Sequence, residues 1–104
     1  MRQVRYLAQA QDDIISIRRY IASESGDADL ARRFTNRIRE QCRKLAESQG
    51  EIGRTRAESR PNLRSVPFGS YVIFFIYNDS FLDIITIIEG HRDIDALFDS
   101  RREY

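Results

Sequence analysis

The sequence predicts a single α+β domain over residues 1–104, with the element order β-α-α-β-β-β. Three observations support this fold class: a short alternating segment opens the chain, two long segments with helical spacing follow it, and two apolar runs joined by a tight turn come later. Because both helices precede the apolar runs, we expect an N-terminal helical hairpin packed on one face of a small, mostly antiparallel sheet.

The first two elements differ in their apolar spacing. Residues 2–7 alternate between two faces and carry two arginines, which is typical of an edge strand protected against unwanted pairing. From Ala8 the period becomes helical, and Gly26 ends this first helix. Asp12 and Asp13 lie near its start, where we expect them to favour the helix dipole. The inner face consists of Ala10, Ile14, Ile17 and Ile21.

The second predicted helix begins after Asp27, which suits an N-cap, and runs to about residue 48. Its apolar stripe consists of Ala31, Phe34, Ile38, Cys42 and Leu45. The short link between the helices predicts an antiparallel helical hairpin. The outer face of this helix is basic and carries Arg32, Arg33, Arg37, Arg39, Arg43 and Lys44. We favour a solvated face for these side chains, and a partner contact is the alternative.

The remaining elements follow a polar linker. Residues 49–62 contain two glycines and a proline and predict a connecting loop, after which residues 63–66 form a short strand. Residues 71–77 and 81–88 are rich in Ile, Val, Phe and Tyr and predict an antiparallel hairpin across the turn at residues 78–80. Residues 94–98 again have helical spacing.

The predicted hairpin is apolar on both faces. One face of its first strand consists of Val72, Phe74 and Ile76, and the other consists of Tyr71, Ile73, Phe75 and Tyr77. Because the helices cover only one face, we expect the chain's own tail or a partner to cover the second. Most of these aromatic residues predict core packing, and we single out Tyr71 and Tyr77 as partner contacts on the second face.

Composition narrows the class of protein. No apolar run approaches the length of a membrane span, and no secretory signal heads the chain, so we expect a cytoplasmic protein that does not bind a membrane. The single cysteine, Cys42, has no His or Cys partner at metal-ligand spacing, so we expect neither a disulfide nor a metal or other cofactor. The net charge is +1, yet residues 1–65 carry +5 and residues 66–104 carry −4, which favours an acidic partner for the basic part.

The sequence offers one candidate for catalysis. It contains no phosphate-binding glycine loop, zinc spacing or nucleophile elbow, and its only histidine is His91. His91 could act as a general acid in phosphodiester cleavage, with Arg92, Arg64 and Arg54 stabilising the developing charge. We favour the alternative that His91 holds a loop, because no general base is evident.

Several segments together resemble a known family. Residues 63–75 (LRSVPFGSYVIFF), residues 89–94 (EGHRDI), Gly53-Arg54 and Tyr20-Ile21-Ala22 look like the corresponding parts of ParE toxins in the RelE/ParE superfamily. The resemblance spans nearly the whole chain in the same order. The sequence departs from common ParE chains at Ser48-Gln49-Gly50, where a proline often follows the second helix.

This resemblance implies a toxin of a type II toxin–antitoxin system that inhibits DNA gyrase, is not an enzyme, and forms a hetero-oligomer with a cognate antitoxin. It implies no sequence-specific DNA binding. The candidate partner contacts are Arg54, Arg56, Arg64, Tyr71, Tyr77 and Arg92. The alternative is a ribosome-dependent mRNA endonuclease of the RelE type, in which His91, Arg64 and Arg92 would be catalytic. The sequence departs from that branch, whose members use basic and aromatic side chains near the last strands, because its single lysine, Lys44, lies on the helical hairpin.

Overall fold

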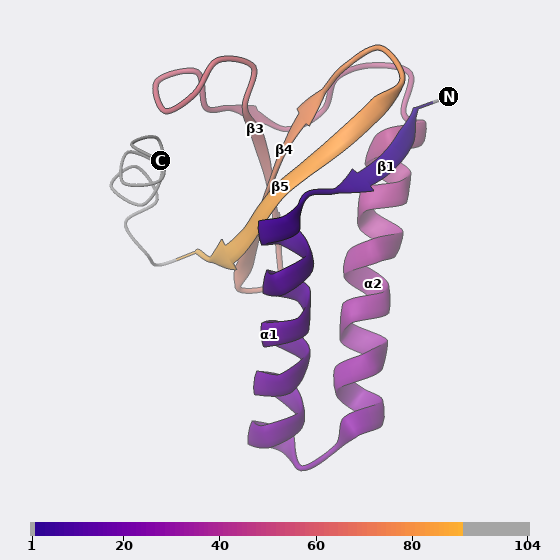
Figure 1. Cartoon of the computed structure of the whole chain (residues 1–104), viewed down its shortest axis with the longest axis vertical. Helices are drawn as coiled ribbons and strands as arrows, with labels where there is room; N and C mark the ends of the chain where they lie inside the picture. The colour runs from indigo at the N-terminus through magenta and orange to yellow at the C-terminus, as the bar shows by residue number, and fades with distance from the viewer. Residues whose placement is uncertain (1, 91–104) are drawn as a thin grey trace.

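The computed structural model describes residues 2–90 as two helices and a five-stranded sheet (Figure 1). The elements in chain order are β1 (Gln3–Tyr6), α1 (Ala8–Ser25), α2 (Ala28–Glu47), β2 (Arg54–Thr55), β3 (Arg64–Phe68), β4 (Tyr71–Tyr77) and β5 (Phe81–Glu89). The predicted α+β class is confirmed. The predicted order lacks only β2, because a two-residue strand is too short to produce an alternating pattern. The predicted helical segment at residues 94–98 lies outside the described residues.

The strands are arranged in the order β1-β5-β4-β3-β2. The pairs β2–β3, β3–β4 and β4–β5 are antiparallel, whereas β1 pairs with β5 in parallel. The β4–β5 ladder contains an irregularity, because Phe74 pairs with Thr86 and Phe75 pairs with Ile84. Ile85 is therefore an extra residue, which forms a β-bulge in β5.

Local sequence explains where the helices begin and end. Gly26 adopts a left-handed conformation (φ 68°), and its N–H donates to the carbonyl of Ala22 at 2.9 Å, which ends α1. The carboxylate of Asp27 accepts a hydrogen bond from the amide of Leu30 at 3.0 Å and caps the start of α2. Since these two caps are adjacent in sequence, the helices run antiparallel and lie side by side (Figure 1). Both predicted caps are confirmed.

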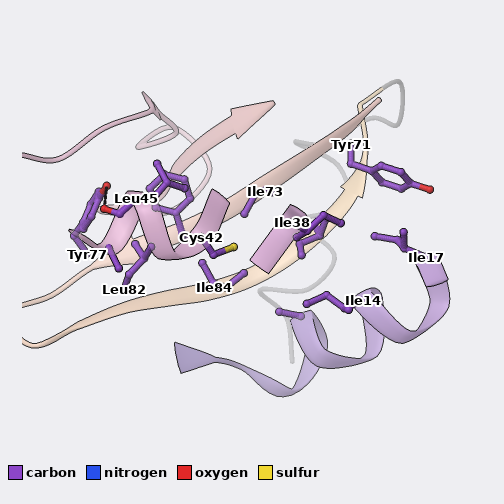
Figure 2. Packing of buried hydrophobic residues seen from close by; sticks show 14 residues of the cluster. Ile14, Ile17, Ile38, Cys42, Leu45, Tyr71, Ile73, Tyr77, Leu82 and Ile84 are labelled. Atoms are coloured by element: carbon purple, nitrogen blue, oxygen red, sulfur yellow. Dashed lines mark hydrogen bonds between the residues drawn. The ribbon is translucent and has the colours of Figure 1, made fainter. Parts of the chain in front are cut away.

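The main core lies between the helices and one face of the sheet. The residues of β4 on this face are Tyr71, Ile73, Phe75 and Tyr77, and they pack with Ile14, Ile17, Ile38, Cys42 and Leu45 of the helices (Figure 2). Tyr71 and Tyr77 are only 9% and 8% exposed. The prediction that places these two tyrosines on the second face is therefore wrong. Alternation alone defines two sets of side chains, but it does not say which set meets the helices.

The second face of β4 is covered in part by the chain itself. Phe74 lies on this face in a smaller buried cluster with Leu63 and Ile88. Arg56 places its guanidinium 5.7 Å from the centre of the Phe74 ring. Leu63 and Arg56 both belong to the segment between β2 and β3, so a segment that precedes the hairpin provides cover that the sequence assigns to the tail or a partner.

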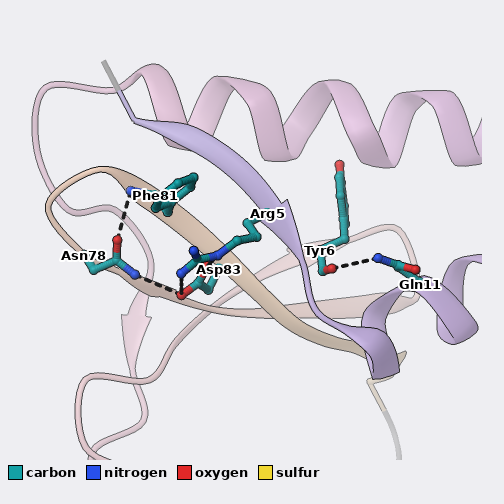
Figure 3. A network of polar contacts seen from close by, with 6 residues as sticks. All are labelled: Arg5, Tyr6, Gln11, Asn78, Phe81 and Asp83. Atoms are coloured by element: carbon teal, nitrogen blue, oxygen red, sulfur yellow. Dashed lines mark hydrogen bonds and ion pairs between the residues drawn. The ribbon is translucent and has the colours of Figure 1, made fainter.

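The edge strand β1 is tied to β5 by polar contacts (Figure 3). The guanidinium of Arg5 forms a two-pronged ion pair with Asp83, at 2.6 Å and 3.0 Å. Asn78 donates from its side-chain amide to the same carboxylate at 2.9 Å and accepts from the amide of Phe81 at 2.9 Å. The register of the edge strand and the shape of the β4–β5 turn are thus fixed through one carboxylate.

Tyr77 connects the core to the linker that follows α2. Its buried hydroxyl donates to the carbonyl of Leu45 at 3.0 Å and accepts from the amide of Ile52 at 3.3 Å. We predict that Tyr77→Phe lowers the free energy of unfolding by about 1–2 kcal/mol, because the buried hydrogen bond to the carbonyl of Leu45 and the partly buried bond from the amide of Ile52 are both lost. Urea denaturation measures this change. The matched control is Tyr20→Phe, since Tyr20 is 56% exposed. Equal urea midpoints for the two variants would contradict a stabilising role for the hydroxyl of Tyr77.

Gly53 allows the linker to approach the sheet closely. Its φ is +101°, and a Cβ atom there would lie 2.9 Å from both Cζ of Phe75 and the carbonyl oxygen of Ser65. We predict that Gly53→Ala destabilises the fold by about 2–3 kcal/mol, because backbone strain and the clash with a buried ring act together. Gly50→Ala is the control, as a Cβ atom added to Gly50 would meet nothing within 4 Å. Thermal unfolding should separate the two variants clearly, and a small effect at Gly53 would mean that the linker can move away.

Candidate functional site

The arginines predicted as partner contacts fall into two groups in the structure. Arg56 donates from Nε to the hydroxyl of Ser65 at 2.9 Å, and Arg64 donates from Nη1 to the carbonyl of Gly53 at 3.1 Å. Arg64 also lies 3.4 Å from the carboxylate of Glu51. Arg54 is exposed and forms no ion pair with the residues that the structure describes. Arg56 and Arg64 therefore hold the linker, while Arg54 is available to a partner.

A second available arginine was not among the predicted contacts. Arg60 lies in the turn between β2 and β3, where its amide donates to the carbonyl of Arg56 at 3.0 Å. Its side chain is exposed, and within residues 2–90 it has no carboxylate partner. The turn therefore presents Arg60 on the same linker as Arg54. Sequence spacing could not identify it, because in a loop the direction of a side chain depends on the turn that forms.

The arginine-rich face of α2 is partly neutralised within the helix. Arg32 pairs with Asp29 at 3.0 Å, and Arg43 pairs with Glu47 at 3.0 Å and also with Glu40. These are exposed pairs between residues three or four positions apart, which contribute little to stability. They favour the interpretation of this face as a solvated surface.

Tyr71 lies at the edge of the main core rather than on the second face. Figure 2 shows its ring at the end of the cluster beside Ile17. Burial raises the pKa of its phenol, and the nearby carboxylate of Glu89 and the phenol of Tyr20 add to the increase. Tyr71, Tyr20 and Glu89 all line an open groove of about 340 Å³ between α1 and β5, which we call the α1–β5 groove.

Asp13 joins the two walls of the α1–β5 groove. Its carboxylate accepts hydrogen bonds from the amide of Ile87 at 3.0 Å, from the hydroxyl of Thr86, and from the side chain of Gln9 at 2.8 Å. The sequence predicts that Asp13 favours the helix dipole, but no acidic residue lies in the first turn of α1. Its main contacts are with β5, so it connects the helix to the strand.

The thiol of Cys42 is poorly placed to act as a nucleophile. Cys42 is buried in the main core, and burial raises the pKa of its thiol to about 11.

Among residues 2–90, no group of three or more His, Cys, Asp and Glu side chains is placed to hold a metal ion. Neither of the helices described in that range is both long and apolar enough to cross a membrane. His91 and Arg92 lie outside the described residues, so their predicted roles stay predictions.

We predict that Asp13→Ala lowers the free energy of unfolding by about 1–3 kcal/mol, because it leaves the amide of Ile87 and the buried hydroxyl of Thr86 without their acceptor. Asp12→Ala is the control, since Asp12 is exposed and adjacent in sequence. Urea denaturation of both variants measures the difference. If both substitutions had the same small effect, Asp13 would not link the helix to the strand.

Comparisons with known proteins identify the family of this chain. The family model for the ParE toxin of the type II toxin–antitoxin system parDE matches residues 4–94. One solved structure, the chromosomal ParDE toxin–antitoxin system from P. aeruginosa, has a TM-score of 0.72, and the alignment covers 86% of this chain and 96% of that chain. Its sequence identity of 18% supports similarity of fold alone. No curated protein sequence matches. Because the family model covers most of the sequence, this chain belongs to the family of ParE toxins of type II toxin–antitoxin systems.

Proposed function

We propose that this toxin inhibits DNA gyrase by binding it, without catalysing a reaction, and that a cognate antitoxin neutralises it in a hetero-oligomer in the cytoplasm. The match of the ParE family model over residues 4–94 carries this proposal. The proposed partners are two proteins, and the proposal requires neither a cofactor nor recognition of a DNA sequence.

The linker arginines supply a contact surface for gyrase. Arg54 and Arg60 are exposed and lack carboxylate partners among the described residues, while the linker that carries them is fixed by Arg56, Arg64 and Gly53. A rigid segment loses little conformational entropy on binding, and its charges favour association with an acidic surface. The other proposed contacts, Arg56 and Arg64, would contribute indirectly, because their hydrogen bonds hold the linker in position. Tyr77 would also hold the linker, through the hydrogen bonds of its hydroxyl to Ile52 and Leu45.

An mRNA endonuclease of the RelE type has less support. Its proposed catalytic set includes Arg64, whose guanidinium is engaged by the carbonyl of Gly53 and the carboxylate of Glu51. Binding a scissile phosphate would require Arg64 to give up these contacts. The endonuclease therefore remains an outcome of the test rather than a second proposal.

We predict that the purified toxin stops supercoiling by gyrase and that cleaved DNA accumulates. The double variant Arg54→Glu and Arg60→Glu should require about tenfold more toxin for the same inhibition, because two cations at the contact become anions. Arg33→Glu is the matched control, since Arg33 is an exposed arginine on α2. A gel-based supercoiling assay measures both effects.

Unimpaired supercoiling at excess toxin would refute gyrase inhibition. Cleavage of ribosome-bound mRNA that disappears in His91→Ala would establish the endonuclease instead. Equal inhibition by the double variant and the control would be consistent with gyrase as the target, but it would show that Arg54 and Arg60 do not contact gyrase.

A further inference from the structure

The two edges of the sheet differ in the backbone groups that they leave unpaired. One edge consists of the two residues of β2 and the rest of β3, where Pro67 has no N–H to donate. The other edge is the outer side of β1, next to α2 (Figure 1). Beyond the end of β1, the amide of Ile87 in β5 already donates to Asp13. Within residues 2–90, β1 is therefore the edge best suited to an incoming strand.

Alternate residues of β1 direct their backbone groups away from β5. The amides of Gln3 and Leu7 donate, at 3.0 Å each, to carbonyls of the segment that contains β5. Because pairing alternates along a parallel ladder, the amide and carbonyl of Val4 and the amide of Tyr6 point outward. These three groups have no hydrogen-bond partner among residues 2–90. The carbonyl of Tyr6 accepts from the side chain of Gln11 at 2.9 Å, which closes this end of the edge (Figure 3).

A groove of about 400 Å³ lies between β1 and α2, and we call it the β1–α2 groove. Val4 and Tyr6 line it from the strand, and the guanidinium of Arg39 lies 5.2 Å from the centre of the Tyr6 ring. In a strand added beside β1, the residues opposite Val4 and Tyr6 would direct their side chains into this groove. Main-chain pairing at an open edge combined with a pocket for alternate side chains is a recurrent mode of peptide recognition.

The charges of the β1–α2 groove favour an acidic side chain at one position. Arg43 lines the groove but pairs with Glu47, which also lines it. Arg2 also lines an adjoining groove that contains Asp79. Arg39 is exposed and has no carboxylate partner among residues 2–90. Since a guanidinium binds a carboxylate through charge-assisted hydrogen bonds, Arg39 offers a contact for an acidic side chain of the added strand.

We propose that β1 receives an extended, acidic segment of the antitoxin as a sixth strand, with one carboxylate of that segment bound to Arg39. This inference rests on the proposed function, because it assumes that an antitoxin binds this toxin. β1 has four residues, so the added strand is short. Its main-chain hydrogen bonds contribute affinity, and Arg39 contributes the preference for an acidic sequence. The strand order places β1 and β2 at opposite edges, so this site is remote from Arg54, the proposed gyrase contact.

The test of main-chain pairing uses the full-length toxin and the antitoxin encoded beside it, with affinity measured by calorimetry. Val4→Pro removes an outward N–H that has no partner among residues 2–90, and it should weaken binding by about tenfold or more. The matched control is Val4→Ala, which shortens the same side chain but keeps the N–H and should bind within about threefold of wild type. Circular dichroism verifies that both variants are folded. Equal affinity of the two variants would overturn the strand addition.

Hydrogen exchange tests the same pairing in the unmodified toxin. On binding of the antitoxin, the amides of Val4 and Tyr6 should gain about tenfold more protection than those of Gln3 and Leu7, which are already bonded within the toxin. Equal gains at all four amides would overturn the pairing, since they would report a general stabilisation of the toxin.

Charge reversal tests the contact with Arg39. Arg39→Glu should weaken binding about tenfold, whereas Arg33→Glu should have little effect, because it makes the same change at an exposed position of α2 outside the groove. One replacement of an aspartate or glutamate of the antitoxin by arginine should restore affinity for the Arg39→Glu toxin. Equal affinities of the Arg39→Glu and Arg33→Glu toxins would overturn the acidic contact.

Two further results separate the possible occupants and functions. A loss of affinity in Arg39→Glu without a loss in Val4→Pro would indicate a helix in the groove and would overturn the inference. Gyrase inhibition by the toxin alone is measured in parallel and should be unchanged in both variants. A failed inference and a failed function therefore give different results.

Discussion

The fold depends on the burial of β4 on both of its faces. Phe74 on one face and Phe75 on the other are completely buried, so each face must be covered by another layer. The helices cover the Phe75 face, and the segment between β2 and β3 contributes Leu63 and Arg56 to the Phe74 face. Because apolar burial dominates folding stability, the linker must cross the sheet edge to reach the second face.

This requirement explains why the linker is well held although it has little secondary structure. The hydroxyl of Tyr77 fixes Ile52, and Gly53 lies against Phe75 where no side chain would fit. Arg64 then bonds to the carbonyl of Gly53 from β3. Contacts from two core strands thus set the position of the linker and of Arg54, which immediately follows Gly53. A loop that contacts with the core hold in place can present its charged side chains in fixed positions.

The sequence predicted elements whose signals are local. The hairpin boundaries at Tyr71, Tyr77 and Phe81 and the caps at Gly26 and Asp27 agree with the structure, because apolar period and capping chemistry depend on near neighbours. Three features depend instead on tertiary contacts: the two-residue strand β2, the bonding of Asp13 to β5, and the choice of face that buries Tyr71 and Tyr77. Likewise, only packing shows that Arg56 and Arg64 support the linker while Arg54 remains exposed.

The α1–β5 groove follows from where the chain leaves the sheet. Leu7 makes the last backbone bond of the first segment to β5, through the carbonyl of Ile84, and α1 begins at the next residue. The bulge at Ile85 comes directly after that bond, and Asp13 of α1 then supplies the acceptor that a longer β1 would have supplied to Ile87. A longer β1 would continue along the edge of β5, but the carboxylate of Asp13 bonds only to the amide of Ile87 and to neighbouring side chains. The rest of this edge of β5 is therefore not paired with β1 and lines the α1–β5 groove, to which Asp13 contributes a negative charge.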